Sequence, residues 1–148
     1  MYSKLFILLA FTGLMFASCS KDYVEINREE ILNYLSENNI DAEEHESGLF
    51  YLTTQTGDGN HPSSSATVVV KYTGKLLNGT VFDGTSNGES VTFPLGNLIP
   101  GWQIGIPLLE RGGKGTFFIP SELGYGSRAT GSIPANSVLI FDIELVNF

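Results

Sequence analysis

Apolar and polar residues alternate most regularly near the C-terminal end of the chain. From residue 139 to residue 145 every odd-numbered position is apolar, and the even-numbered positions between them include Asp142 and Glu144. A period of two residues is that of a β-strand with one buried face. We therefore predict a strand over 138–148, with both carboxylates on its solvent side.

Short apolar stretches rich in β-branched and aromatic residues recur upstream, separated by turn-forming Gly, Asn and Pro. They predict further strands at 49–54, 66–72, 81–82, 91–93 and 115–119. Between them, only 99–109 has a helical pattern, in which Pro100 suits the first turn and Pro107 must end or bend the helix. The sequence therefore predicts an α+β fold, with a curved antiparallel β-sheet wrapped around one short α-helix.

A second helix is predicted ahead of this domain. Asn27 can cap a helix, Glu30 follows three residues later, and Ile31, Leu32 and Leu35 then form an apolar stripe. A helix of about ten residues is too short to be stable alone in water. We expect it to dock on the domain or to remain a mobile tether, and a dimerisation helix is the less favoured alternative. A monomer is expected.

Residues 1–18 have the pattern of an export signal, with Lys4, an apolar run over 5–16, and small residues before position 19. The run is too short to span a bilayer, which takes about 20 residues. Cys19, the only cysteine, follows the small residues and resembles the lipidated cysteine of a bacterial lipobox. The alternative is an inert buried cysteine. We predict a lipid on Cys19 and a place in the bacterial cell envelope, at the periplasmic or surface side of the outer membrane.

Charge separates the chain into parts. The formal net charge is -8, and the acidic side chains concentrate ahead of residue 47. We therefore predict three segments: the signal peptide 1–18, an acidic lipid-anchored spacer 19–46 that includes the short helix, and a globular domain 47–148. An acidic surface also argues against nucleic acid as a partner, because phosphate binding needs basic side chains.

Several short motifs follow one another through the domain. They are VKYTG (70–74), GTVFD (79–83), FPLG (93–96), IPGW (99–102), IPS (119–121), GYG (124–126) and FDIEL (141–145). Together they resemble the FKBP family of peptidyl-prolyl cis/trans isomerases (rotamases). The resemblance implies a folding catalyst for exported or envelope proteins, which binds proline-containing polypeptide clients and the macrolide inhibitors of this family.

Rotation about an X-Pro bond crosses a barrier of about 18–20 kcal/mol set by amide resonance. No covalent bond breaks, so the reaction needs no cofactor, metal or nucleophile. A dry apolar pocket favours the twisted amide, which is less polar than the planar one, and a few donors fix the proline segment.

The resemblance implies roles for residues at matching positions. Trp102 is the pocket floor, the Tyr125 hydroxyl bonds a ligand carbonyl, and Asp83 lies near the twisting amide; these are the candidate catalytic residues. The implied substrate-binding residues are Tyr72, Phe82, Val91, Phe93, Leu98, Ile99, Ile133 and Phe141. The Ile99 backbone N–H would be a second ligand donor. Val91 stands where many members carry Phe, and the loop after Tyr125 is one residue shorter than usual.

Four alternatives to these roles are compatible with parts of the sequence. The aromatic residues can simply be core, and Asp83 can cap the turn toward Gly84. The same pocket can also serve a non-enzymatic binding module, a holdase or surface adhesin. A hydrolase using Asp142 and Glu144 is disfavoured, because both lie on the solvent face of a strand.

Overall fold

The computed structural model describes residues 22–86 and 88–148. The predicted export signal and Cys19 lie outside them. The described strands are β1 (Glu43–Glu44), β2 (Phe50–Gln55), β3 (Thr67–Leu76), β4 (Val81–Gly84), β5 (Val91–Pro94), β6 (Lys114–Ile119) and β7 (Leu139–Asn147). The helices are α1 (Tyr23–Glu37), α2 (Pro100–Gly105) and the 3-10 turns η1 (Leu95–Asn97), η2 (Ile106–Leu108) and η3 (Ser121–Leu123).

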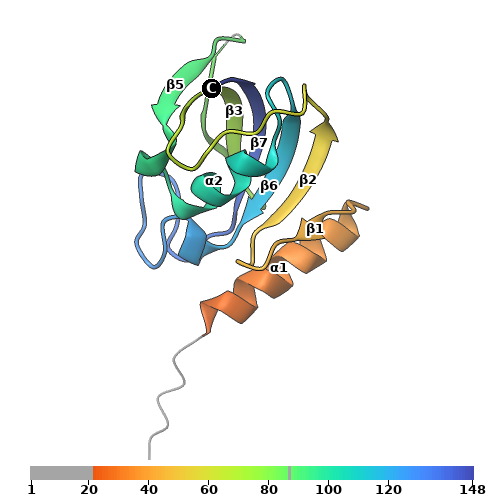
Figure 1. Cartoon of the computed structure of the whole chain (residues 1–148). Helices are drawn as coiled ribbons and strands as arrows, with labels where there is room; N and C mark the ends of the chain where they lie inside the picture. The colour runs from red at the N-terminus through yellow and green to blue at the C-terminus, as the bar shows by residue number, and fades with distance from the viewer. Residues whose placement is uncertain (1–21, 87) are drawn as a thin grey trace, which may run out of the picture.

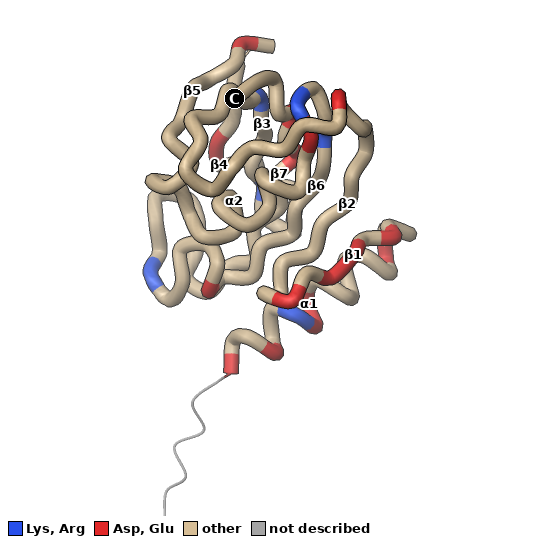
Figure 2. Tube along the Cα trace, in the orientation of Figure 1, with Lys and Arg blue, Asp and Glu red and all other residues tan. Residues whose placement is uncertain are grey.

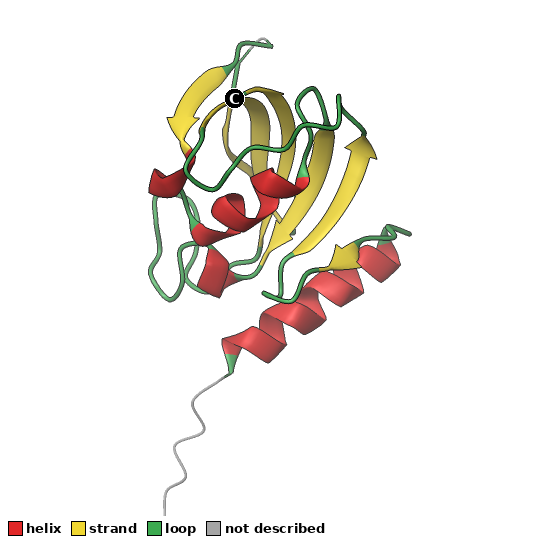
Figure 3. Ribbon diagram, viewed as in Figure 1, coloured by secondary structure: helices red, strands yellow, loops and turns green. Residues whose placement is uncertain are grey.

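The strands form one antiparallel sheet in the order β1-β2-β6-β7-β3-β4, and β5 pairs with β3 as well. The sheet curves around α2. Helix α1 runs below the sheet, beside β1 and β2 (Figures 1 and 3). This is the predicted α+β architecture. The predicted strands are all present, whereas the two-residue strand β1 carries only glutamates and was not predicted.

The alternation in β7 is confirmed by its burial. Leu139, Phe141, Ile143 and Leu145 are at most 3% exposed and join the main core between sheet and α2. Asp142 and Glu144 lie on the opposite face. Ile140 shares that face but is only 1% exposed, because α1 covers this end of the sheet.

Helix α2 is short, as Pro107 predicts. Pro100 occupies its first turn, and the chain passes into the 3-10 turn η2 at Ile106. A Cβ atom on Gly101 would lie 2.5 Å from a methyl carbon of Ile119, so the helix lies directly on β6. This close approach fixes the position of Trp102, the next residue.

Helix α1 begins earlier than predicted. Its N-cap is Asp22, whose side chain accepts a hydrogen bond from the Val24 N–H at 3.1 Å, and the helix has 15 residues. Asn27 is therefore not a cap. It is an interior helix residue only 1% exposed, since its amide is used in contacts with the domain. The helix ends at Glu37, with Asn38 as its C-cap.

A second hydrophobic core joins α1 to the sheet. Ile31 and Leu35, one turn apart, pack with Phe50, Phe118, Val138 and Ile140. Leu32, the third residue of the predicted stripe, is 39% exposed. The helix thus packs on the domain in this structure, and most of its charged residues are acidic (Figure 2). Among residues 22–86 and 88–148, no helix has the length and apolar character needed to cross a membrane.

Candidate functional site

A cavity of about 210 Å³ opens between α2 and the curved sheet. Eight residues from separate segments of the chain line it: Tyr72, Asp83, Phe93, Leu98, Ile99, Trp102, Tyr125 and Phe141. All eight were predicted as site residues from the sequence. The fold therefore gathers strands β3, β4, β5 and β7, helix α2 and two loops at one concave surface.

Trp102 is held by aromatic rings on its sides. Its ring centroid is 5.0 Å from that of Tyr72, 5.2 Å from Phe141 and 6.1 Å from Phe93, with interplanar angles of 85°, 90° and 79°. Edge-to-face contacts of this kind favour one ring orientation. Trp102 is only 5% exposed, so the indole is a fixed, apolar surface of the cavity.

Asp83 is held at the rim by two hydrogen bonds. The Tyr72 hydroxyl donates to Oδ2 at 2.8 Å, and the Gly84 N–H donates to Oδ1 at 2.8 Å. The contact with Gly84 is the turn interaction expected in the simpler interpretation, and it coexists with a place in the cavity wall. Burial, and secondly the hydrogen bond to Asp83, raise the pKa of the Tyr72 hydroxyl, which therefore remains a donor at neutral pH.

Besides the buried Nε1–H of Trp102, two donors at the cavity have no acceptor within the described part of the chain. One is the hydroxyl of Tyr125, a residue that is 40% exposed just after η3. The other is the N–H of Ile99, which precedes α2 and whose carbonyl accepts from the Trp102 N–H at 3.0 Å. Both can therefore serve a bound carbonyl oxygen.

Gln103 was not predicted as part of the site. Its side-chain amide donates to the carbonyls of Leu98 and Gly96, at 2.7 and 3.3 Å. These bonds anchor the loop that presents the Ile99 N–H. The signal for such a role was available, since Gln103 is the one polar side chain in the short helix α2.

Three predicted site residues do not line the cavity. Phe82 packs behind it, with its ring 5.5 Å from Phe141 and nearly perpendicular. Val91 packs against the main core from β5 and faces a neighbouring hollow. Ile133, in the loop that follows Tyr125, is 6% exposed and packs into the main core.

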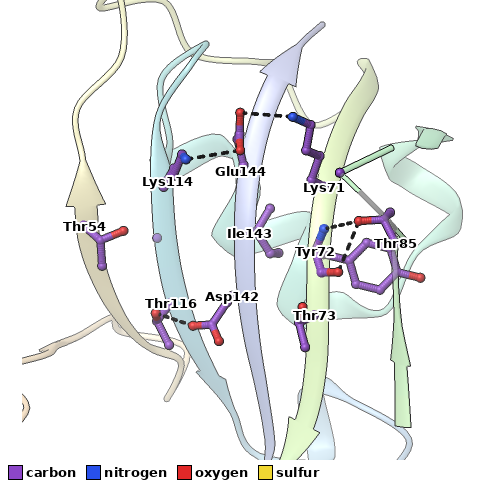
Figure 4. Close-up of a pocket in the computed structure, with 12 residues that line it drawn as sticks. Thr54, Lys71, Tyr72, Thr73, Thr85, Lys114, Thr116, Asp142, Ile143 and Glu144 are labelled. Atoms are coloured by element: carbon purple, nitrogen blue, oxygen red, sulfur yellow. Dashed lines mark hydrogen bonds and ion pairs between the residues drawn. The ribbon is translucent and has the colours of Figure 1, made fainter. Parts of the chain in front are cut away.

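A larger hollow, of about 410 Å³, lies on the outer face of the sheet (Figure 4). Its charged groups are paired. Glu144 contacts Lys114 at 3.3 Å and Lys71 at 3.8 Å, and Asp142 accepts from Thr116 at 2.7 Å and from Lys75 at 2.9 Å. These carboxylates are neutralised on an open sheet face, in agreement with their predicted solvent position.

Comparison with known proteins places the domain in a family. The family model of the FKBP-type peptidyl-prolyl cis-trans isomerases matches residues 59–146. The chain is 45% identical over 133 residues to the FKBP-type peptidyl-prolyl cis-trans isomerase FkpA of Aeromonas hydrophila, covering 88% of this chain and 49% of that protein. It thus spans about half the length of this relative.

Solved structures agree. FkpA from Escherichia coli superposes with a TM-score of 0.74 at 36% identity, over 84% of this chain and 60% of that one. A peptidyl-prolyl cis-trans isomerase from Pseudomonas syringae superposes with a TM-score of 0.72 at 26% identity, over 84% and 94%. The chain belongs to the FKBP-type peptidyl-prolyl cis-trans isomerase family.

Proposed function

We propose that this protein accelerates cis/trans isomerisation of X-Pro bonds, and that the cavity over Trp102 is its active site. The observation that carries the proposal is the combination, in one cavity, of a fixed aromatic floor, two free donors and an oriented carboxylate. Family membership supports the same activity.

The cavity suits the reaction physically. The proline ring would lie on the Trp102 indole, enclosed by Tyr72, Phe93 and Phe141. An apolar enclosure withdraws water from the amide, and the planar amide loses more from this than the less polar twisted one. The enclosure would therefore bind the twisted state more tightly than the ground state, which is the condition for catalysis.

The two donors would hold the peptide on either side of the rotating bond. The Ile99 N–H and the Tyr125 hydroxyl would each donate to a peptide carbonyl, so that rotation is confined to the X-Pro bond itself. One peptide segment would be held fixed while the other rotates. The bound peptide would therefore already be close to the geometry in which it reacts.

Asp83 would act on the electrostatics of the twisting amide. Its carboxylate is oriented by the Tyr72 hydroxyl and the Gly84 N–H, and a charge fixed in place costs little reorganisation when the amide dipole changes. Asp83, Trp102 and Tyr125 are thus the proposed catalytic residues, and Tyr72 positions the first of them.

The proposed substrates are proline-containing segments of exported or envelope proteins, whose folding is slowed by X-Pro isomerisation over tens to hundreds of seconds. Macrolide inhibitors of the family would occupy the same cavity. A lipid on Cys19 would anchor the protein at the outer membrane, with the acidic segment as spacer. A monomer would suffice, because one chain supplies the whole cavity.

The activity is tested with a short Leu-Pro peptide that a protease cleaves only in the trans form. Added protein should raise the rate of the slow cleavage phase in proportion to its concentration. A protein that binds proline peptides or a macrolide without any rate increase would instead be a binding module, and the proposed activity would be wrong.

A further inference from the structure

The most unusual polar group outside the cavity is the side chain of Asn27. It lies in the middle of α1 and is only 1% exposed. Its Oδ1 accepts from the Ser121 N–H at 2.8 Å, and its Nδ2 donates to the Asn136 carbonyl at 3.2 Å and to Glu30 Oε2 at 3.1 Å. Two of these partners lie 94 and 109 residues away in the sequence.

The bonds of Asn27 close a ring that includes the base of the Tyr125 loop. The Ser121 carbonyl accepts from the Gly126 N–H at 2.7 Å, and the Gly126 carbonyl accepts from the Asn136 N–H at 2.8 Å. The Asn136 carbonyl then accepts from Asn27, and Asn27 accepts from Ser121. Two of these four hydrogen bonds link α1 to the start and the end of the segment 121–136, and the other two tie Gly126 to both ends of that segment.

Tyr125 lies inside this ring, between Ser121 and Gly126. The backbone there takes a shape that is not the default for a chain, since Gly126 and Asn136 have positive φ angles of 63° and 58°. Glycine and asparagine adopt such angles more readily than other residues, so the sequence permits this shape and hydrogen bonds can fix it. The ring supplies those hydrogen bonds, and it leaves the Tyr125 hydroxyl at the cavity.

Docking of the helix does not by itself require an amide at this position. Ile31 and Leu35 already bury apolar surface against Phe118 and Ile140. A buried amide is favourable only when its donors and acceptor are satisfied, and an apolar residue can replace a docking contact. The placement of Asn27 is therefore explained by its hydrogen bonds to the loop.

We propose that Asn27 is a positioning residue of the active site, through which α1 sets the place of Tyr125. The macrolide-affinity test of this inference rests on the proposed function. A second test, by hydrogen exchange, does not depend on it. Helix α1 is then part of the catalytic unit and more than a spacer.

A double-mutant cycle on the full chain tests this. Trp102 is the only tryptophan, so its fluorescence reports macrolide binding at the cavity. Asn27→Leu should weaken macrolide affinity about two- to tenfold, the effect of losing one well-placed hydrogen bond. In a Tyr125→Phe background the same substitution should change affinity less than about twofold, because the hydroxyl it positions is already gone.

A second substitution removes the donor, instead of the acceptor, of the hydrogen bond between Ser121 and Asn27. Ser121→Pro removes the N–H that donates to Asn27, and Pro120 already has the φ of -63° and ψ of 155° suited to a residue before proline. It should weaken affinity as Asn27→Leu does, and keeps the test available if that variant fails to fold. Leu35→Ala is the control, since it loosens the α1 contact without touching the ring and should leave affinity unchanged.

Hydrogen exchange gives the readout that needs no ligand. Asn27→Leu should speed exchange of the Gly126 and Asn136 amides, and Leu35→Ala should not do so selectively. Unchanged exchange at these two amides, or an affinity loss that is equal in the parent and in the Tyr125→Phe background, would overturn the inference. If the parent neither binds macrolide nor shows turnover, the proposed function fails, and exchange alone decides the role of Asn27.

Discussion

Each oxygen of Asp83 accepts one hydrogen bond, so the carboxylate is fixed before any substrate arrives. Asp83→Ala should therefore lower kcat on the order of tenfold, about 1.4 kcal/mol of transition-state stabilisation, with a smaller change in macrolide affinity. Protease-coupled kinetics together with fluorescence titration measure the two effects separately. Glu89→Ala, which removes an exposed acid from the loop beyond β4, is the control for charge. Equal losses in both variants would assign the effect to net charge.

Tyr125 presents a hydroxyl without an acceptor in the described part of the chain. Tyr125→Phe keeps the ring and should weaken macrolide binding by about 0.5–1.5 kcal/mol while leaving stability nearly unchanged. Titration by Trp102 fluorescence measures the affinity and urea unfolding measures the stability. Tyr23→Phe, on the partly exposed start of α1, is a matched control. An affinity equal to that of the parent would exclude the hydroxyl from ligand binding.

Two leucines of helix α1, one buried and one exposed, allow a test of whether the helix packs on the sheet. Leu35 is 6% exposed in the second core and Leu32 is 39% exposed on the same helix. Leu35→Ala should reduce the free energy of unfolding by about 2–5 kcal/mol, because it leaves a cavity against the sheet. Leu32→Ala makes the same chemical change and should cost about 0.5 kcal/mol or less. Urea unfolding compares them, and similar losses would mean that the helix does not pack as described.

Some of the elements can be predicted from local sequence patterns alone, and others cannot. Strand β7 is predictable because one face meets the core at every second residue. The predicted start of α1 was wrong because Asp22 and Asn27 are both good capping residues. Only the fold shows that Asp22 caps the helix and that the Asn27 amide bonds to the domain. The burial of Ile140, on the same face as the two carboxylates, could not be predicted, because the helix that covers it lies more than a hundred positions earlier in the chain.

At the scale of the whole molecule, the cavity residues could be predicted because they belong to short motifs of a known family or, for Leu98, lie directly beside one. The Asn27 ring could not, since its partners are backbone groups that carry no sequence signal. The distinction between cavity and supporting residues was also missed: the resemblance assigned Phe82, Val91 and Ile133 to the cavity, but they pack in the main core and do not line it.

The proposed position of the molecule in the cell depends on Cys19. Cys19→Ala removes the proposed lipid attachment site and should shift the protein from the membrane fraction to the soluble fraction or leave it unprocessed. Fractionation after labelling with a fatty acid measures this, and the parent protein should carry the label. An unlabelled parent, together with undiminished membrane association of the variant, would contradict the lipid anchor.

We propose that catalysis takes place in the cavity floored by Trp102. Its most direct test follows turnover of a Leu-Pro peptide and the fluorescence of this single tryptophan during the same macrolide titration. We predict turnover above the uncatalysed rate, lost in parallel with the fluorescence change and with one common midpoint. Turnover that persists after the fluorescence change is complete, or that never exceeds the uncatalysed rate, would contradict the claim.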